Sequence, residues 1–216
     1  MREKENNMLQ PYEYNTVKNQ ISNLINIYKT VSDKDVIMTS QEMVTSQLRP
    51  VLGEALHEKI CLSYLDVTLT NAKAVPLFET IKEEVEPFKQ VSDKQLEKVF
   101  RKVKKMKYPN WDQLDLQELN YLAWDDIGTQ RKYISFYEND KLVGFYGVMS
   151  TNVIKNVCSI CHQVDNVAMF LSTTKSSGDG TYTKKGNYIC KDSVKCNQQM
   201  HDLSHLHDFY HTVTDK

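Results

Sequence analysis

Four cysteines in the second half of the sequence have the spacing of metal ligands. Cys158 and Cys161 form a C-x2-C pair, and Cys190 and Cys196 follow 28 residues later as a C-x5-C pair. Two residues between cysteines let both sulfurs turn onto one ion, and a helix that begins before Cys196 favours its thiolate. This spacing is typical of a treble-clef zinc finger. Because four sulfurs complete a tetrahedron, we expect one structural Zn²⁺ with no position open for water or substrate.

Two other uses of these cysteines fit the sequence less well. The polar beginning "MREKENNMLQPYEYN" and the lack of an apolar run long enough for a membrane span or leader predict a cytoplasmic protein, where disulfides are rare. A redox C-x-x-C pair would need a thioredoxin-like βαβ pattern, which the sequence does not show. The fifth cysteine, Cys61, lies among apolar residues in "EKICLSYL" and is expected to be a core side chain.

The histidines near the C-terminus are a rival candidate site. His201 and His205, and then His207 and His211, are four residues apart, as in the H-E-x-x-H motif of metalloproteases. Aspartate replaces the glutamate base, however, and the two pairs face different directions on a helix. Neither a nucleophile elbow nor a phosphate-binding glycine loop is present, so we expect a protein that is not an enzyme. The expected buried side of this helix carries Leu203, Leu206, Tyr210 and Val213.

Residues 1–89 predict a helical domain. Apolar side chains recur there at three- and four-residue spacing in separate stripes, and each stripe marks one face of an amphipathic helix. Stripes of this kind form core far more often than cofactor pockets. Short links between the helices favour an antiparallel four-helix bundle. The four stripes begin at Val17, Ile37, Ile60 and Val75.

A domain boundary is predicted at "EPFKQVSDK", where Ser92 and Gln95 make a capping box for the next helix. Residues 90–216 would then form the second domain. Its first helix is expected to be basic, with seven Lys or Arg and two acidic side chains between Asp93 and Lys107. Such a face is usually just solvated, but it could touch an acidic partner or RNA. The net charge of −1 argues against a general polyanion binder.

After this helix the hydrophobic pattern changes from helical to alternating. Two strands, 132–137 and 142–148, are predicted to be joined by a turn at 138–141. Further short strands fit "NVIKNV", "VAMFLST" and "TYTKKGNYI", and the chain returns to helix from 192 to 213. The predicted fold class is α+β, with a helical bundle followed by an α/β domain that holds the treble clef.

Several motifs resemble those of one known family. With "LEKVFRKVKKMKYP", "YLAWDD", "QRKYISFY", "GFYGVMS", "VCSICH" and "GTYTKKGNYICKDSVKCNQQ", the sequence resembles the FusB-type fusidic acid resistance proteins, also called elongation factor G-binding proteins. The resemblance implies a helical N-terminal domain and a C-terminal domain with a four-cysteine treble clef. It also implies binding to elongation factor G, chiefly its C-terminal domains, and release of the factor from ribosomes on which fusidic acid has trapped it. Family members neither degrade nor modify the drug.

The resemblance also suggests which residues contact the partner. The "KKGNY" turn before Cys190 resembles the factor-contacting loop of the family, whereas ordinary loop charge is the alternative for its lysines. The basic helix supplies further candidates. The six candidate contacts are Lys184, Lys185, Tyr188, Arg101, Lys102 and Lys105.

The sequence departs from the family at Val157 and Leu206, where aromatic residues are common, and exposed aromatic side chains often anchor interfaces. We expect a monomer that acts on the ribosome indirectly, through elongation factor G, without direct RNA binding. The alternative is a zinc module that binds ribosomal RNA or the ribosome through the basic helix.

Overall fold

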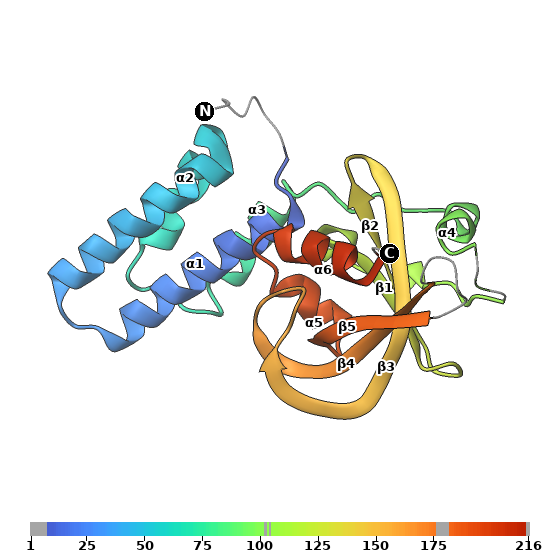
Figure 1. The fold of residues 1–216 in the computed structure, drawn as a ribbon. Helices are drawn as coiled ribbons and strands as arrows, with labels where there is room; N and C mark the ends of the chain where they lie inside the picture. Colours follow the sequence, from blue (N-terminus) through green and yellow to red (C-terminus); the bar gives the residue numbers. More distant parts are fainter. Residues whose placement is uncertain (1–7, 102, 104, 176–181, 215–216) are drawn as a thin grey trace. The chain divides into compact units, whose positions relative to one another are not determined.

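The computed structural model describes residues 8–101, 103, 105–175 and 182–214, and the chain divides into two compact units, Met1–Pro87 and Phe88–Lys216 (Figure 1). The first unit is helical, and the second contains a five-stranded antiparallel sheet with helices packed on it. The α+β fold class is therefore confirmed. No helix in the described part of the chain has the length and apolarity that crossing a membrane requires.

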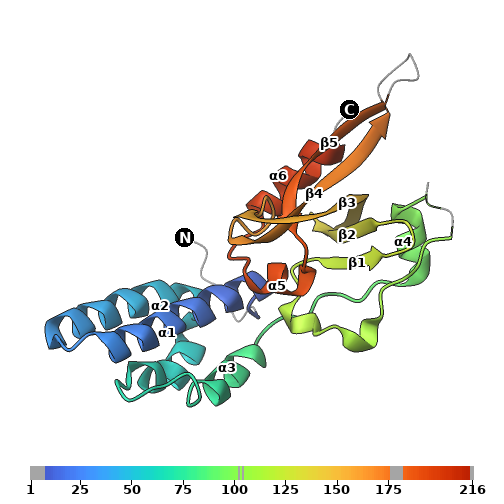
Figure 2. The same cartoon turned by 90° about the horizontal axis from the view of Figure 1, so that it is seen from below.

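The described part of the first unit, from residue 8 onward, contains three helices: α1 (Pro11–Thr30), α2 (Lys34–Leu65) and α3 (Val75–Lys82). Pro11 starts α1, and Gln10 and Glu13 form a capping box there. The long helices α1 and α2 run side by side in opposite directions (Figures 1 and 2).

The core of this unit is apolar, and the first predicted stripe lies within it. Side chains from all three helices are almost fully buried together because each helix turns one apolar face inward. They include Val17, Ile21, Leu24, Ile25, Leu48, Ile60, Tyr64 and Ile81.

A kink in α2 accounts for the two helices that were predicted separately from Ile37 and Ile60. Gly53 has φ 72° and ψ 167° within the helix, a conformation that is open essentially only to glycine. Pro50, three residues earlier, lacks the N–H of a regular helical hydrogen bond. The two predicted helices are therefore the two arms of one kinked element.

The sheet of the second unit has its strands in sequence order, each antiparallel to the next. The first strand was not predicted, because it is short and ends in two aspartates. The strands are β1 (Leu122–Asp126), β2 (Arg131–Glu138), β3 (Lys141–Val157), β4 (Val164–Lys175) and β5 (Tyr182–Cys190).

The predicted hairpin between β2 and β3 is present. Glu138 pairs with Lys141, and the two residues between them have positive φ: 48° at Asn139 and 61° at Asp140. This is the backbone of a tight type I′ hairpin turn, which Asn and Asp tolerate. The prediction of a separate strand at "NVIKNV" was wrong, because β3 continues through it after a register shift between Met149 and Val153.

Helices cover both faces of this sheet. The helix α6 (Ser204–Thr214) packs on β3, β4 and β5, where Phe209 meets Phe145 and Phe170 with ring centroids 5.7 Å apart. On the other face, Phe100 contacts Trp124 and Tyr133 edge to face. Gly144 lies beneath Phe100, and a Cβ at this glycine would come within 2.7 Å of the ring, so glycine permits this close approach.

The basic helix is shorter than predicted. The helix α4 covers only Asp93–Val99, and Phe100 leaves helical geometry at φ −103° and ψ 41°. Leu96 and Phe100 are already buried at this point, while the lysines beyond them would repel one another along a continued helix. The prediction of a helical basic face up to Lys107 was therefore wrong.

The C-terminal helical segment was also predicted as one helix, from 192 to 213, but it is two. The helix α5 (Ser193–Gln198) ends, and a short non-helical segment leads to α6. At the start of α6, the Asp202 carboxylate accepts a hydrogen bond from the backbone N–H of Ser204 at 2.7 Å. Met200, in the segment between the two helices, is fully buried. The inward side of α6 consists of Leu206, Phe209 and Val213, whereas Leu203 and Tyr210 are only half-buried.

Candidate metal centre

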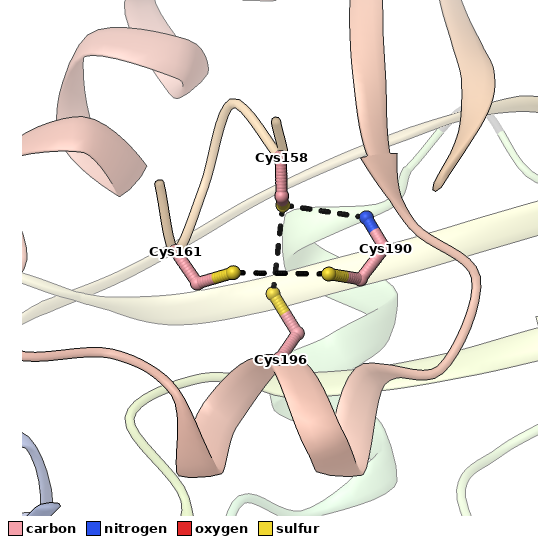
Figure 3. Close-up of side chains that lie close together, drawn as sticks. All are labelled: Cys158, Cys161, Cys190 and Cys196. Carbon is pink, nitrogen blue, oxygen red and sulfur yellow. Dashed lines mark hydrogen bonds between the residues drawn. The ribbon is translucent and has the colours of Figure 1, made fainter. Parts of the chain in front are cut away.

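The four predicted cysteines lie together, although they come from three different elements (Figure 3). Cys158 and Cys161 belong to the turn between β3 and β4, Cys190 ends β5, and Cys196 lies in α5. All four side chains are buried, and their sulfurs all lie within 4.8 Å of one another. Among the described residues, no other group of three or more His, Cys, Asp or Glu side chains meets that limit.

The distances between the sulfurs fit a metal ion rather than disulfides. Cys158 Sγ lies 3.8 Å from Cys196 Sγ, and Cys161 Sγ lies 3.7 Å from Cys190 Sγ. A disulfide would bring two sulfurs to about 2.05 Å. A tetrahedral zinc ion with bonds of about 2.3 Å would hold its sulfur ligands about 3.8 Å apart. All four thiols are free, so the donor set fits a closed, structural Zn²⁺ site.

Backbone hydrogen bonds shape the first pair into a knuckle. The N–H of His162 donates to Cys158 O at 3.0 Å, and His162 takes a φ of 56° to close the turn. The N–H groups of Ile160 and Cys190 both point at Cys158 Sγ at 3.3 Å. Hydrogen bonds from Cys161 and the other two cysteines hold the pKa of the Cys158 thiol well below its usual value. The same contacts raise the pKa values of Cys190 and Cys196, so Cys158 holds the negative charge and binding of a metal would release protons from the other two.

The short helix α5 aims the fourth sulfur. The Asp192 carboxylate caps the helix by accepting hydrogen bonds from the N–H groups of Val194 and Lys195. Cys196 lies one turn further on, with its sulfur directed at the other three (Figure 3). A helix of only six residues is marginal alone, so its position depends on the contacts around it.

One of these contacts is Asn197, which the sequence analysis did not single out. Its side chain is 1% exposed, and its Oδ1 accepts from the backbone N–H groups of Asn120 and Tyr121 at 2.7 and 3.1 Å. Its Nδ2 donates to the carbonyls of Tyr121 and Ser193. Asn197 thus fixes α5 to the segment before β1. Only its position beside Cys196 could have indicated this role.

Asp165 is a second residue that the sequence analysis missed. Its carboxylate accepts from Lys195 Nζ at 2.7 Å and from Gln199 Nε2 at 3.0 Å. The hydrogen bond from Lys195 is the main reason that the pKa of Asp165 falls to about 2. Lys195 precedes Cys196 and Asp165 lies on β4, so this network joins α5 to the sheet.

Three of the candidate partner contacts lie on a strand and not on a loop, so the prediction of a "KKGNY" turn was wrong. In β5, Lys184 pairs with Thr173, Lys185 with Ser172, and Tyr188 with Met169. Lys184 is exposed, whereas Lys185 and Tyr188 are half-buried. The alternation along a strand places Lys184 and Tyr188 on one face and Lys185 on the other.

The other candidate contacts follow α4. Arg101 is exposed, and its Nε donates to Lys98 O at 3.0 Å. Lys105 is exposed with a φ of 56°, and Lys102 lies outside the described residues. These side chains therefore do not form one helical face.

Of the two departures from the family pattern, only one lies at the surface. Val157 is 45% exposed at the end of β3, whereas Leu206 is fully buried on the inward side of α6. Leu206 is therefore a packing position and cannot itself replace an exposed aromatic anchor.

The prediction that His201 and His205 share one face of a helix was wrong, because α6 begins at Ser204 and His201 precedes it. The other histidines make contacts of their own. The His205 ring stacks on His162 of the knuckle with centroids 3.5 Å apart. His207 Nδ1 and His211 Nε2 both approach Glu138 Oε1, at 3.0 and 3.1 Å. These contacts attach the ends of α6 to the knuckle and to β2.

Comparisons with known proteins agree with this geometry. The family model described as elongation factor G-binding protein, N-terminal, matches residues 8–89, and the FBP C-terminal treble-clef zinc-finger model matches residues 96–213. No curated protein matches the sequence significantly. Among solved structures, the chain is similar to that of the fusidic acid resistance protein FusC, with 35% identity and a TM-score of 0.90 over 97% of this chain and 99% of that chain. The chain therefore belongs to the FusB-type family of elongation factor G-binding proteins with a C-terminal treble-clef zinc finger.

Proposed function

We propose that this protein binds elongation factor G in the cytoplasm and promotes its release from ribosomes stalled by fusidic acid. The observation that carries the proposal is the match of both family models in one chain, together with the similarity to the fusidic acid resistance protein FusC over nearly the whole length of both chains. The protein would act as a monomer on the C-terminal domains of the factor. It would affect the ribosome only indirectly.

The proposed mechanism needs binding and no chemical step. A protein can shift its partner between two states only if it binds one of them more tightly. If it binds the ribosome-free factor better, the excess of binding free energy draws the factor off the ribosome. A tenfold shift requires about 1.4 kcal/mol of differential binding.

One Zn²⁺ bound by the four cysteines is proposed to make the binding surface rigid. Tyr188 is two residues from Cys190, and its carbonyl accepts a hydrogen bond from Ser159 N, in the knuckle, at 2.9 Å. The metal would thereby fix the end of β5, which carries Lys184, Lys185 and Tyr188. A rigid, basic and aromatic strand can engage an acidic partner with little loss of conformational entropy on binding.

Binding to purified elongation factor G, free of RNA, tests the proposal. Saturable binding by calorimetry and faster release of the factor from fusidic acid-stalled ribosomes are expected from the wild type. Lys184→Glu should weaken both in parallel, because it reverses an exposed charge without touching the core. Lys141→Glu, a charge reversal at the exposed start of β3, is the matched control. A wild type that never binds the factor would refute the proposal.

The same experiment addresses the RNA alternative. RNA binding was predicted through a basic helical face up to Lys107, but this helix ends at Val99, so the structure offers less support for RNA binding. If direct RNA binding were the function, affinity for naked ribosomal RNA would fall steeply with the logarithm of salt concentration. Binding to RNA at physiological salt without binding to the factor would favour that alternative.

A further inference from the structure

A buried lysine lies beside the metal centre and is not needed for any contact proposed so far. Lys132, on β2, has a side chain that is only 1% exposed, although an ammonium group is rarely buried unless it is paired. Burial lowers the pKa of Lys132, and the Asp125 carboxylate opposes this shift.

The hydrogen bonds of Lys132 converge on the segment that connects two of the ligands. Its Nζ donates to Ser193 Oγ at 2.7 Å and to Lys191 O at 3.3 Å. Lys191 directly follows Cys190, and Ser193 is the first residue of α5, which carries Cys196. The third acceptor is the Asp125 carboxylate of β1, at 3.2 Å. One ammonium group thus ties the path from Cys190 to Cys196 to two strands of the sheet.

The negative charge of a loaded metal centre would be stabilised by the ammonium group of Lys132. Four thiolates around one divalent cation carry a net charge of about −2, which is costly to bury without a counter-charge. Asp125 is 43% exposed, so water partly screens its hold on the ammonium, whereas the sulfurs are buried. A fixed positive charge on the segment between Cys190 and Cys196 lowers the energy of the loaded site.

We propose that Lys132 is a positioning residue of the metal centre: its ammonium group holds the Cys190–Cys196 segment in place and balances the charge of the thiolates. The inference rests on the proposed Zn²⁺ site and not on binding to elongation factor G. Partners of metal ligands typically change metal affinity by about 10- to 100-fold when they are replaced. Lys132 should have an effect of this size although it never touches the metal.

Full-length Lys132→Met and Lys132→Gln test the proposal, with Lys141→Met as the control. Lys141 is exposed and begins β3 at the hairpin, at the opposite end of β2 from Lys132. Lys141→Met changes the net charge of the protein by the same amount as Lys132→Met, but far from Lys132. Zinc affinity is measured by competition with a chromophoric chelator. The sulfur-to-cobalt charge-transfer bands are recorded after Co²⁺ replaces the zinc, because they report charge near the sulfurs directly.

Lys132→Met should bind zinc about 10- to 100-fold more weakly, and its charge-transfer bands should move to longer wavelength. Lys132→Gln should show the same band shift but a smaller loss of affinity, because its amide can still donate to Ser193. The Lys141→Met variant should match the wild type in both measurements.

The inference is overturned if Lys132→Met and Lys132→Gln keep both the affinity and the bands of the wild type, even if they melt at lower temperature. Lys132 would then act only in packing. If Lys132→Met does not fold, the band shift of Lys132→Gln alone decides. A wild type that binds no zinc or cobalt would instead overturn the zinc assignment, and this inference with it.

Discussion

The two units of the chain are held together in different ways. Nine polar or charged residues are buried in the described chain, and only Asn15 and His57 belong to the first unit. The other seven lie in the second unit, which also contains the four cysteines. The first unit therefore depends on apolar packing, and the second depends on directional polar contacts and a metal.

This difference follows from the kind of segments that each unit packs together. Packed helices need only matching apolar faces, and such cores tolerate moderate change. The knuckle, the end of β5 and α5 are short segments that bury little apolar surface, so a metal and buried hydrogen bonds must fix them. The dependence on metal is thus the consequence of holding together short segments that share little apolar surface.

Removal of the metal should produce the largest contrast between the units. In Cys190→Ser one of the four sulfurs is lost, and a structural zinc contributes on the order of 10 kcal/mol to folding. We expect the second unit to lose its protease resistance while the helical circular dichroism of the first unit persists. Elemental analysis should show about one zinc in the wild type and a strong loss in the variant. Loss of all helical signal in one step would show that the two units do not fold independently.

A cavity in the first unit should produce the opposite pattern. Leu24 is fully buried in α1, and truncation of such a leucine costs about 2–5 kcal/mol. In Leu24→Ala, urea should unfold the first unit at lower concentration, while metal content stays at the wild-type level. Zinc loss in this variant would contradict the separation of the two cores.

The kink in α2 provides a smaller test that involves the backbone alone. A Cβ at Gly53 would meet nothing within 4 Å, so Gly53→Ala introduces strain without a clash. Because the φ of 72° with ψ of 167° suits only glycine, we expect a loss of about 1–3 kcal/mol in the first unit. Denaturation curves would measure this loss. An unchanged midpoint would mean that α2 can straighten at no cost.

The smallest expected effect concerns acid. The N–H and hydroxyl of Thr68 hydrogen-bond the Asp66 carboxylate and lower its pKa. A carboxyl with a lowered folded pKa stabilises above its unfolded pKa of about 3.9, and this stabilisation is lost as pH falls through the folded value. Asp66→Asn should therefore be slightly less stable than the wild type at pH 7. The difference in unfolding free energy between the two proteins should disappear below about pH 4. A stability difference that persists at pH 2 would show that the ionised Asp66 carboxylate is not its cause.

Local sequence was sufficient for features that depend on neighbours in the chain. The helical stripe from Val17 to Ile25, the capping box at Ser92 and the hairpin turn at Asn139 and Asp140 were all predicted, because periodicity, capping and turn chemistry act over a few residues. Element ends were predicted less well. The helix α4 stops at Val99 because Phe100 packs against Trp124 and Tyr133, which come later in the sequence.

The spacing of the cysteines by itself determined that a four-sulfur metal site was the best hypothesis, because metal ligation imposes a recognisable spacing on the chain. Tertiary structure alone decided what surrounds the site. Asn197 reaches Asn120 and Tyr121, and Lys132 reaches Ser193, across about 60 to 77 residues of sequence. No local pattern encodes such pairs, since a buried hydrogen bond is specified only when folding brings both partners out of water together.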